Sequence, residues 1–330
     1  MKMKEKQKKN PGHHISLLAT PTENENYDKK YQRYLEINHL LQSLISSGSK
    51  LPTVTPNEVG QLIQSLKSNK AAEIFGITSE HLKFASENLH YILAQVINII
   101  IKSGRIPELL KIGKVRPILK KNKSSKNPTN YRRITITSIV GKVLEKYLLA
   151  RTKILLDPAQ SPLQFGFTPK CSPVYAAIAL TEILAEAKDN AEELHIAFMD
   201  TSKAFDVVHH SGMLNSLYQQ GVNGDLWHLY NNLYQDIKSV VLWKGHQSTS
   251  FHENQGIRQG GTTSADLYKA GKNDLLTTLS NKTSCHIGYI NVGAIMVADD
   301  LAIAANSESD LQHVRGYRCH NSLPAAKIHF

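Results

Sequence analysis

The stretch HIAFMDTSKAFDVV, His195 to Val208, decides the fold because an apolar run within it ends abruptly at a carboxylate. Its first part, from Ile196 to Met199, has the composition of a buried strand. Asp200 follows at the point where such a strand leaves its sheet. The sequence therefore predicts a strand that delivers one acidic side chain to the end of a sheet.

A second stretch, GAIMVADDLAIAA from Gly293 to Ala305, has two apolar runs that flank Ala298, Asp299 and Asp300. This pattern predicts a β-hairpin with the acids at its tip. If the two stretches are neighbours, Asp200, Asp299 and Asp300 converge at one end of one sheet. Carboxylates that close together repel one another unless a cation lies among them, and oxygen ligands select Mg²⁺ or Mn²⁺. The pattern favours metal-assisted phosphoryl or nucleotidyl transfer.

The composition is that of a globular protein: 330 residues, of which 41% are hydrophobic and 20% charged. The formal net charge of +11 favours a polyanionic partner, either nucleic acid or an anionic membrane surface. Three scattered cysteines are too few for a disulfide framework or a zinc site, so a reducing compartment is expected. The longest apolar run, 91–101, is too short to cross a bilayer, so we expect no membrane association. The basic N-terminus fits nucleus and cytoplasm alike, and we expect an intracellular protein.

Helix and turn signals organise the rest of the chain. Residues 1–30 are polar and lysine-rich, which predicts disorder. Thr55 to Glu58 form a capping box with proline at the first helical position, which predicts a helix to about residue 68. A long apolar helix is expected from Ser79 to about Gly104. Further helices are expected near 31–45, 139–148, 173–188, 214–217, 225–233 and 264–279, and a hairpin is expected over 240–251 with its turn at Gly245.

Two stretches carry features of phosphate-binding sites. KVRPILKK (114–121) and NYRRITIT (130–137) predict a hairpin that bears Lys120, Lys121, Arg132 and Arg133. Such a run of charge is most often a solvated surface. The more specific and less common interpretation is that the hairpin binds phosphates. GIRQGG (256–261) is a glycine-rich loop that leads into a helix, where backbone amides can approach a phosphate. Taken alone, it is more simply an ordinary loop.

The order of the motifs resembles the reverse transcriptase of a non-LTR (LINE-type) retrotransposon from about Pro52 to Ser307. Seven motifs carry this resemblance: KAAEIFGITSEHLK (70–83), GRIPELLKIGKVRPILKK (104–121), NYRRITITSIVGKVLE (130–145), QFGF (164–167), FMDTSKAFD (198–206), GIRQGGTTS (256–264) and VADD (297–300). The resemblance implies an α+β right-hand polymerase fold with fingers and palm. It also implies an RNA-directed DNA polymerase that adds dNTPs to a DNA primer 3′-hydroxyl on an RNA template.

The resemblance assigns roles to the residues that match its motifs. Asp200, Asp299 and Asp300 match the catalytic ligands of two Mg²⁺ (or Mn²⁺) ions. Phe205 matches the bulky residue that excludes a ribose 2′-hydroxyl, which gives a steric preference for deoxynucleotides. The remaining nucleotide-binding matches are Gln259 and Gly260 of the glycine loop, and Lys120 or Lys121 with Arg132 of the fingers hairpin. Lys203 and Arg258 are expected to contact nucleic acid.

Other side chains have structural explanations. Asp206 is expected to be a structural acid, and His209 and His210 are expected to be exposed loop histidines. Arg133 occupies a position where the family pattern has proline or glycine, which puts the shape of the fingers hairpin in doubt.

The resemblance also divides the chain into a basic, partly disordered extension (1–50), fingers and N-terminal palm helices (51–190), palm (191–316) and an irregular tail (317–330). Too few residues follow Asp300 for a thumb, so we expect a truncated copy without a thumb and with weak polymerase activity. The alternative is a catalytically dead nucleic-acid-binding remnant of a mobile element. The sequence does not predict the oligomeric state.

Overall fold

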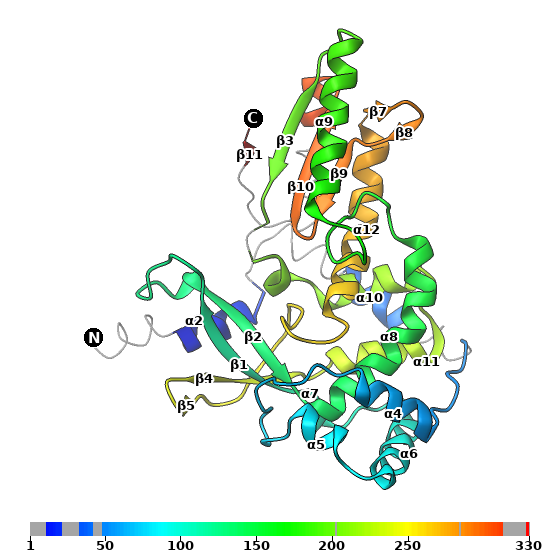
Figure 1. Cartoon of the computed structure of the whole chain (residues 1–330), viewed down its shortest axis with the longest axis vertical. Coiled ribbons are helices and arrows are strands. Elements are labelled where there is room, and N and C mark those ends of the chain that lie inside the picture. The colour runs from blue at the N-terminus through cyan, green and yellow to red at the C-terminus, as the bar shows by residue number, and fades with distance from the viewer. Residues whose placement is uncertain are drawn as a thin grey trace. The chain divides into compact units, whose positions relative to one another are not determined.

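The computed structural model describes residues 11–21, 33–41, 48–201, 203–283, 285–312 and 328–329 (Figure 1). The chain forms two compact units, each assembled from three segments. The first unit contains Met1–Thr22, Glu36–Leu155 and Phe205–Ser264, and the second contains Glu23–Leu35, Leu156–Ala204 and Ala265–Phe330. Helices and strands are mixed, as expected for an α+β protein. The assignment of fingers and palm to linear ranges of the sequence stays a prediction.

The first unit contains the predicted basic hairpin. Strand β1 (Ile112–Leu119) pairs antiparallel with β2 (Tyr131–Thr137), in a register that places Gly113 opposite Thr137 and Leu119 opposite Tyr131. Strand β1 also pairs in parallel with β4 (Lys238–Trp243) through residues 112–115, a pairing that the sequence did not predict. Pro117 lies beyond this shared stretch, so its missing N–H breaks no bond to β4.

The predicted hairpin at Gly245 is confirmed. Strand β4 pairs antiparallel with β5 (His246–Gln247), and Lys244 and Gly245 form the turn with φ values of 49° and 82°. Positive φ at both central residues is typical of the two-residue turns that match the twist of a hairpin. Strand β6 (Phe251–His252) pairs with the start of β4 and completes the sheet of the first unit.

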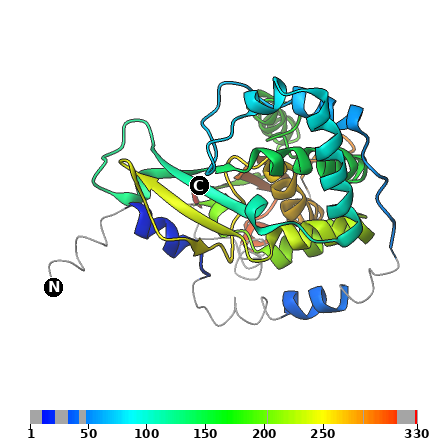
Figure 2. The same ribbon diagram turned by 90° about the horizontal axis from the view of Figure 1, so that it is seen from below.

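The N-terminal segment is more ordered than its composition predicts. Helix α2 (Pro11–Leu18) lies within the range that was expected to be disordered. Ile15 on this helix is buried against Val115 and Val241 of the sheet. Figure 2 shows α2 in dark blue against the β1, β2 and β4 strands. Burial of one apolar side chain on the sheet therefore anchors a segment whose charge pattern suggested a solvated tail, while the lysines of residues 1–10 lie outside the described residues.

Helix starts were predicted better than helix ends. Helix α4 (Pro56–Gln64) begins where Thr55 accepts a hydrogen bond from the Glu58 amide, but it ends before residue 68. The long helix expected from Ser79 is broken into α5 (Ser79–Lys83) and α6 (Glu87–Ser103), because Ser86 is extended (φ −66°, ψ 160°) and starts a new helix. Residues 33–41 are also helical. Apart from two helices of the second unit that are described below, the remaining helices are α7 (Glu108–Lys111), η2 (Pro128–Asn130), α8 (Ile139–Ala159), η3 (Ala204–Val207), α10 (His210–Gln219) and α11 (Gly224–Tyr234).

The second unit contains the two acidic stretches in one sheet. Its strand order is β11-β3-β10-β9, formed by β3 (His195–Met199), β9 (Ala294–Val297), β10 (Asp300–Ala305) and β11 (Ile328–His329). All neighbours are antiparallel. The predicted strand and hairpin are therefore present and adjacent. Strand β11 lies in the tail that was predicted to be irregular, so that prediction is wrong for residues 328–329. A separate small pair is formed by β7 (His286–Ile287) and β8 (Ile290–Asn291).

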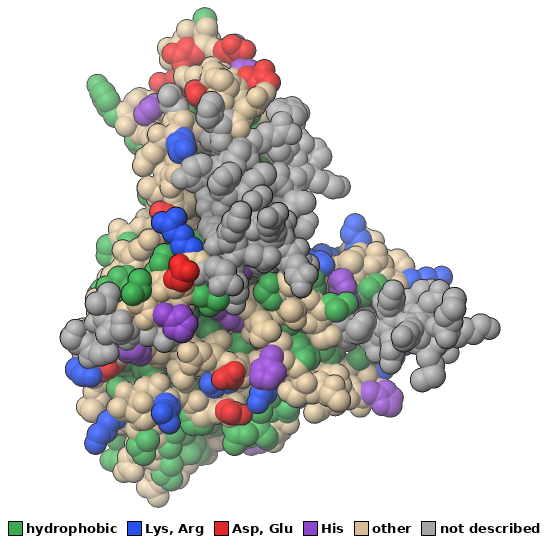
Figure 3. Space-filling model, turned by 180° about the vertical axis from the view of Figure 1, so that it is seen from behind, with side chains coloured by type: hydrophobic (Ala, Val, Ile, Leu, Met, Phe, Trp, Pro, Cys, Tyr) green, Lys and Arg blue, Asp and Glu red, His purple; other side chains and the backbone are tan. Residues whose placement is uncertain are grey.

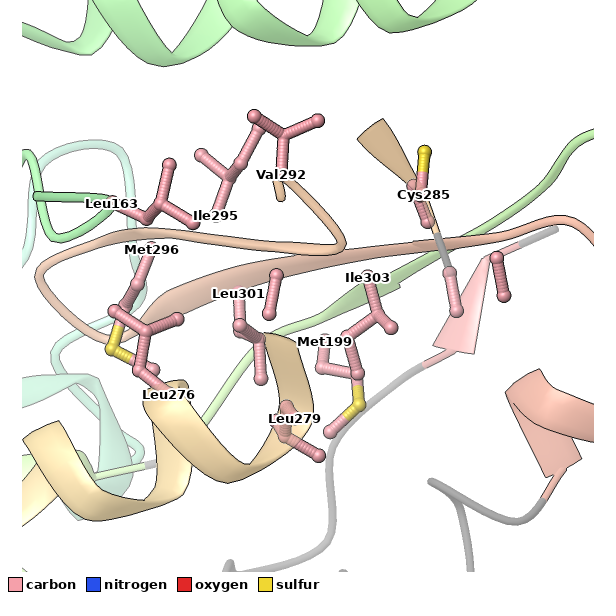
Figure 4. Close-up of a cluster of buried hydrophobic side chains, with 14 of the residues drawn as sticks. Leu163, Met199, Leu276, Leu279, Cys285, Val292, Ile295, Met296, Leu301 and Ile303 are labelled. Atoms are coloured by element: carbon pink, nitrogen blue, oxygen red, sulfur yellow. The ribbon is translucent and has the colours of Figure 1, made fainter. Parts of the chain in front are cut away.

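The core of the second unit holds the acidic ends of these strands in place. Helices α9 (Pro173–Asp189) and α12 (Ser264–Lys282) contribute buried side chains to it. Figure 4 shows Leu276 and Leu279 of α12 directed toward Met199, Met296 and Leu301 of the strands. Met199 immediately precedes Asp200, Leu301 immediately follows Asp300, and Met296 lies three residues before Asp299. Packing of the core therefore fixes the backbone from which the carboxylates project.

No helix within the described ranges combines the length and the apolar composition that a bilayer span requires.

Candidate active site

The three predicted catalytic acids lie at one end of the second sheet. The last pair of the β3–β10 ladder joins Met199 to Leu301. The next residues on these antiparallel strands are Asp200 and Asp300, which are therefore neighbours across the ladder. Asp299 lies in the turn that joins β9 to β10. Asp200 and Asp300, 100 positions apart in the sequence, thus approach one another through strand register.

The electrostatics of these residues agree with that proximity. Burial raises the pKa of Asp299, and the carboxylates of Asp300 and Asp200 raise it further, while Lys272 acts in the opposite direction. Burial also raises the pKa of Asp300, and the Asp200 carboxylate adds to this shift. Each raised pKa reports a site at which negative charge is crowded.

The donor chemistry of the site fits a divalent cation. All three side chains offer carboxylate oxygens, which hard cations such as Mg²⁺ and Mn²⁺ prefer. Asp200 and Asp300 are exposed and Asp299 is half-buried. Across the part of the chain that the structure describes, no group of three or more His, Cys, Asp or Glu side chains lies close enough to hold a metal ion. The fit to a cation therefore rests on the oxygen donors and the negative charge of the three carboxylates. These three side chains are not arranged as a closed coordination cage.

Two residues of α12 lie behind the acidic turn and were not identified from the sequence. Tyr268 is buried, and burial followed by the charges of Asp299 and Asp300 raises its pKa. Lys272 lies one helical turn further, with its Nζ 5.8 Å from the centre of the Tyr268 ring. The only sequence signal for this pair was its i, i+4 spacing on the helix after the glycine loop.

The opposite end of the second sheet is also acidic. Figure 3 shows acidic side chains gathered where α9 ends and β3 begins. Exposed carboxylates at this end include Asp189, Glu192, Glu193 and Glu308. Such a surface repels a polyanion.

The basic hairpin of β1 and β2 in the first unit presents some of its predicted cations to solvent. Arg132 is exposed and pairs across the ladder with the exposed Ile118. Lys121 is exposed, and Lys120 is half-buried, with its amide donating to the Asn130 carbonyl at 2.8 Å. These three side chains therefore lie near the loop that joins β1 to β2.

A cavity of about 720 Å³ lies on the outward face of the same hairpin. Its wall is basic and its floor is apolar, with Ile118, Ile134 and Ile136 on the strands. Burial lowers the pKa of Lys142, and burial together with the charge of Lys67 lowers that of Lys146. The basic residues of the wall are Lys67, Lys70, Arg116, Lys142 and Lys146, and Gly260 and Gly261 of the glycine loop also line the cavity.

Arg133 does not belong to the exposed face of the hairpin, contrary to the prediction. Alternation along β2 turns it to the buried side, where it pairs with Glu253 at 3.0 Å and Asp206 at 3.7 Å. Glu253 also accepts a hydrogen bond from the Arg258 Nε at 2.8 Å. Burial alone raises the pKa of Glu253, but the guanidinium groups of Arg258 and Arg133 outweigh it and hold the pKa below its ordinary value.

This network changes the interpretation of two other residues. The Arg258 side chain, which was expected to reach nucleic acid, is only 11% exposed and is engaged inside the protein. Asp206 is buried beside Arg133, as expected for a structural acid.

The glycine loop is built against β2. The Thr135 amide donates to the Gln259 carbonyl at 2.8 Å. Gly260 has a φ of 121°, and a Cβ on it would lie 2.4 Å from the Thr135 carbonyl oxygen, so only glycine fits. The Phe205 carbonyl accepts from the Ile257 amide at 2.7 Å, which brings Phe205 next to the loop.

Three further predictions concern the segment after Asp200. Lys203 is half-buried and has a φ of 57°. His209 is buried, and a ring nitrogen of His210 lies 2.8 Å from the Gly256 carbonyl oxygen. The expectation that both histidines are exposed in a loop is therefore wrong, because His209 is buried and His210 contacts the backbone of the glycine loop.

The chain is also similar in sequence to known proteins. A family model described as reverse transcriptase (RNA-dependent DNA polymerase) matches residues 118–318, more than half of the chain. The Pol polyprotein of the type-2 retrotransposable element R2DM of Drosophila melanogaster is 24% identical over 278 residues, which cover 84% of this chain and 25% of that protein. The RNA-directed DNA polymerase of the mobile element jockey from the same species is 24% identical over 283 residues, covering 85% of this chain and 30% of that protein. The chain thus spans about a quarter of the length of these relatives.

Proposed function

The chain belongs to the reverse transcriptase (RNA-dependent DNA polymerase) family, and on that premise we propose that it carries the catalytic acids and substrate-binding surfaces of a retrotransposon RNA-directed DNA polymerase. The observation that carries this proposal is the register that makes Asp200 and Asp300 neighbours, with Asp299 in the adjoining turn. Three carboxylates at one sheet end have no evident structural use, because their mutual repulsion destabilises the fold.

We propose that Asp200, Asp299 and Asp300 hold two Mg²⁺ or Mn²⁺ ions. When bound, such ions lower the pKa of a primer 3′-hydroxyl and neutralise charge on a triphosphate. The protein's part is to present the oxygen donors from a rigid sheet end. Lys272 moderates the crowded negative charge near Asp299.

The proposed dNTP site uses residues of the first unit. Arg132, with Lys120 or Lys121, is suited to bind the triphosphate through charge-assisted hydrogen bonds. Gln259 and Gly260 are proposed to contact the nucleotide from the loop that β2 supports, and Gly260 also lines the basic cavity. Phe205, held next to this loop through Ile257, is suited to exclude a ribose 2′-hydroxyl by contact.

The basic cavity supports binding of an RNA template annealed to a DNA primer. Its lysines and Arg116 suit the phosphate backbone, and its isoleucines suit the flat faces of bases. Lys203 is a further proposed contact, and Arg258 is proposed to act by supporting the glycine loop through Glu253. Binding through these cations is expected to weaken steeply with salt.

A primer-extension assay tests the proposal. The chain is mixed with an RNA template, an annealed DNA primer, dNTPs and Mg²⁺ or Mn²⁺. We expect incorporation by the wild type, none by Asp299→Asn, and wild-type incorporation by Asp189→Asn, which removes an exposed carboxylate from the opposite end of the sheet. Equal incorporation by the wild type and Asp299→Asn contradicts the catalytic assignment.

A second function, nucleic-acid binding without turnover, is favoured by one observation. Among the described residues no carboxylate cluster is assembled closely enough to hold a metal ion. This alternative predicts RNA binding that is unchanged by chelating divalent ions, together with zero incorporation under all conditions of the extension assay.

A further inference from the structure

We propose that Gln164 is a positioning residue for the acidic turn, in that its side-chain amide holds the Ala298 peptide from which Asp299 and Asp300 continue. The inference rests on the proposed function, because it names a residue that supports the proposed metal site. Gln164 belongs to the QFGF stretch, one of the seven motifs that carry the family resemblance, but no role was assigned to it from the sequence.

Contacts in the second unit carry this inference. Gln164 is only 2% exposed. Its Oε1 accepts a hydrogen bond from the Ala298 amide at 3.1 Å, and its Nε2 donates to the Ala298 carbonyl at 3.3 Å. The same Oε1 accepts from the Gly166 amide at 2.8 Å. One neutral side chain therefore satisfies both polar groups of a single residue in the turn.

The turn has a conformation that needs such support. Ala298 has a φ of 59°, in the left-handed region that side chains with a Cβ rarely adopt. Strand β9, which leads into the turn, is the last strand in the order of its sheet, and Met296 on it forms an isolated β-bridge with Gln164. An unsupported turn at a sheet edge would be free to relax its backbone, and the two carboxylates that follow would move with it.

The backbone around Gln164 is fitted to the same edge. The Met296 amide donates to the Leu163 carbonyl at 2.9 Å, and the Phe165 amide donates to the Met296 carbonyl at 2.8 Å. A Cβ on Gly166 would lie 1.9 Å from the Ala298 nitrogen, so glycine alone allows this approach. The QFGF loop is thus bonded to β9 by its backbone and to the turn by its glutamine.

A glutamine suits this position for a chemical reason. An amide both donates and accepts, so it can bond the N–H and the C=O of Ala298 together. A glutamate could not donate to the Ala298 carbonyl, and it would add a fourth negative charge near Asp200, Asp299 and Asp300. Methionine has a similar length and no hydrogen-bonding capacity of this kind, so it removes the contacts with little change in volume.

The test measures Mn²⁺ affinity by electron paramagnetic resonance, and amide hydrogen exchange at Ala298 by mass spectrometry, on the full chain. Gln164→Met is compared with the wild type and with Gln160→Met. Gln160 is a matched control, because it lies in the same segment and its side-chain amide donates to the Asn273 Oδ1 at 3.0 Å, away from the turn residue Ala298. For Gln164→Met we expect Mn²⁺ affinity to fall about tenfold or more and exchange at Ala298 to accelerate by a similar factor. Gln160→Met should change neither measurement.

The outcomes separate this inference from the proposed function. If Asp299→Asn abolishes Mn²⁺ binding but Gln164→Met binds as tightly as the wild type, the role of Gln164 is overturned while the metal site stands. If the wild type binds no Mn²⁺, the proposed metal site is overturned and the positioning role falls with it. Gln164→Asn provides a second variant, should Gln164→Met not fold. Its shorter amide remains polar but cannot reach both groups of Ala298, so the same losses are expected.

Discussion

Replacement of Glu253 by glutamine is expected to destabilise the first unit strongly. The Glu253 side chain is 2% exposed and pairs with Arg133 at 3.0 Å and with Arg258 at 2.8 Å. The side chains of Arg133 and Arg258 are 7% and 11% exposed. If the Glu253 carboxylate is lost, water therefore cannot fully solvate either guanidinium in its place. Glu253→Gln preserves size and shape but leaves two buried positive charges short of a counter-charge.

The magnitude follows from these contacts. Each charge-assisted hydrogen bond contributes roughly 1.5–3 kcal/mol, and breaking a buried ion pair by removing one partner costs about 3–5 kcal/mol. Asp206 at 3.7 Å from Arg133 compensates part of the loss, so we expect about 3–5 kcal/mol in total, although two pairs are affected. For a protein of this size that corresponds to a fall in Tm on the order of 10 °C.

The stability difference between the wild type and Glu253→Gln depends on pH, and the direction of the Glu253 pKa shift determines how. Because the pKa of Glu253 is held below its ordinary value, its contribution to stability is present above that ordinary value. The contribution is lost only as the pH falls through the lowered folded-state pKa. The gap in stability between the wild type and Glu253→Gln should therefore be full at pH 7 and narrow in strongly acidic solution.

Urea denaturation followed by circular dichroism measures this effect. The matched control is Glu108→Gln, because Glu108 pairs with Lys238 at 3.3 Å while its side chain is 70% exposed. Exposed pairs of this kind contribute less than about 1 kcal/mol. If Glu253→Gln unfolds within about 1 kcal/mol of the wild type, or no earlier than Glu108→Gln, the network does not stabilise the unit as argued.

Three further substitutions test other parts of the structure. Gly260→Ala should cost more than about 2 kcal/mol in denaturant unfolding, since its Cβ would lie 2.4 Å from the Thr135 carbonyl oxygen. Gly245→Ala, with a φ of 82° and open space around it, should cost less. Asp300→Asn should raise the free energy of unfolding at neutral pH by a few tenths to about 1 kcal/mol. The pKa of Asp300 is raised above its ordinary value of 3.8, so ionisation of this carboxyl destabilises the folded wild type as the pH rises above that value. That gain should shrink in melting curves recorded near pH 4. Thr55→Ala should cost about 1 kcal/mol through loss of its N-cap bond, and an unchanged Tm would contradict the capping role.

The acidic sheet end was predictable because its signal is local. An apolar run that ends at Asp200, and two such runs around Asp299 and Asp300, predict strands whose ends carry acids without any knowledge of pairing. The structure adds the register, with Met199 opposite Leu301, that makes two of these acids neighbours. Their roles as metal ligands remain a prediction.

Long-range contacts were the part that the sequence could not supply. The parallel pairing of β1 with β4 joins segments more than 120 residues apart, and no local pattern distinguishes it from other pairings of two apolar strands. Helix α2 could not be predicted for a similar reason, because the burial of Ile15 depends on strands that come far later in the chain. Gln164 was quoted within a motif, but its role depends on the turn at Ala298, which lies 134 residues away.

Arg133 shows how a departure from a family pattern can be accommodated by a second motif. Where the pattern has a proline or glycine, this chain has a large cation, and strand alternation directs that cation into the interior. A buried guanidinium is unstable without a counter-charge. Glu253 provides this charge and also bonds Arg258 of the glycine loop, so the loop and the fingers hairpin share one carboxylate. It follows that the residue at 133 and the conformation of the glycine loop are energetically coupled. A double-mutant cycle of Arg133→Met and Glu253→Gln should therefore be strongly non-additive, because methionine removes the very charge that glutamine leaves unpaired.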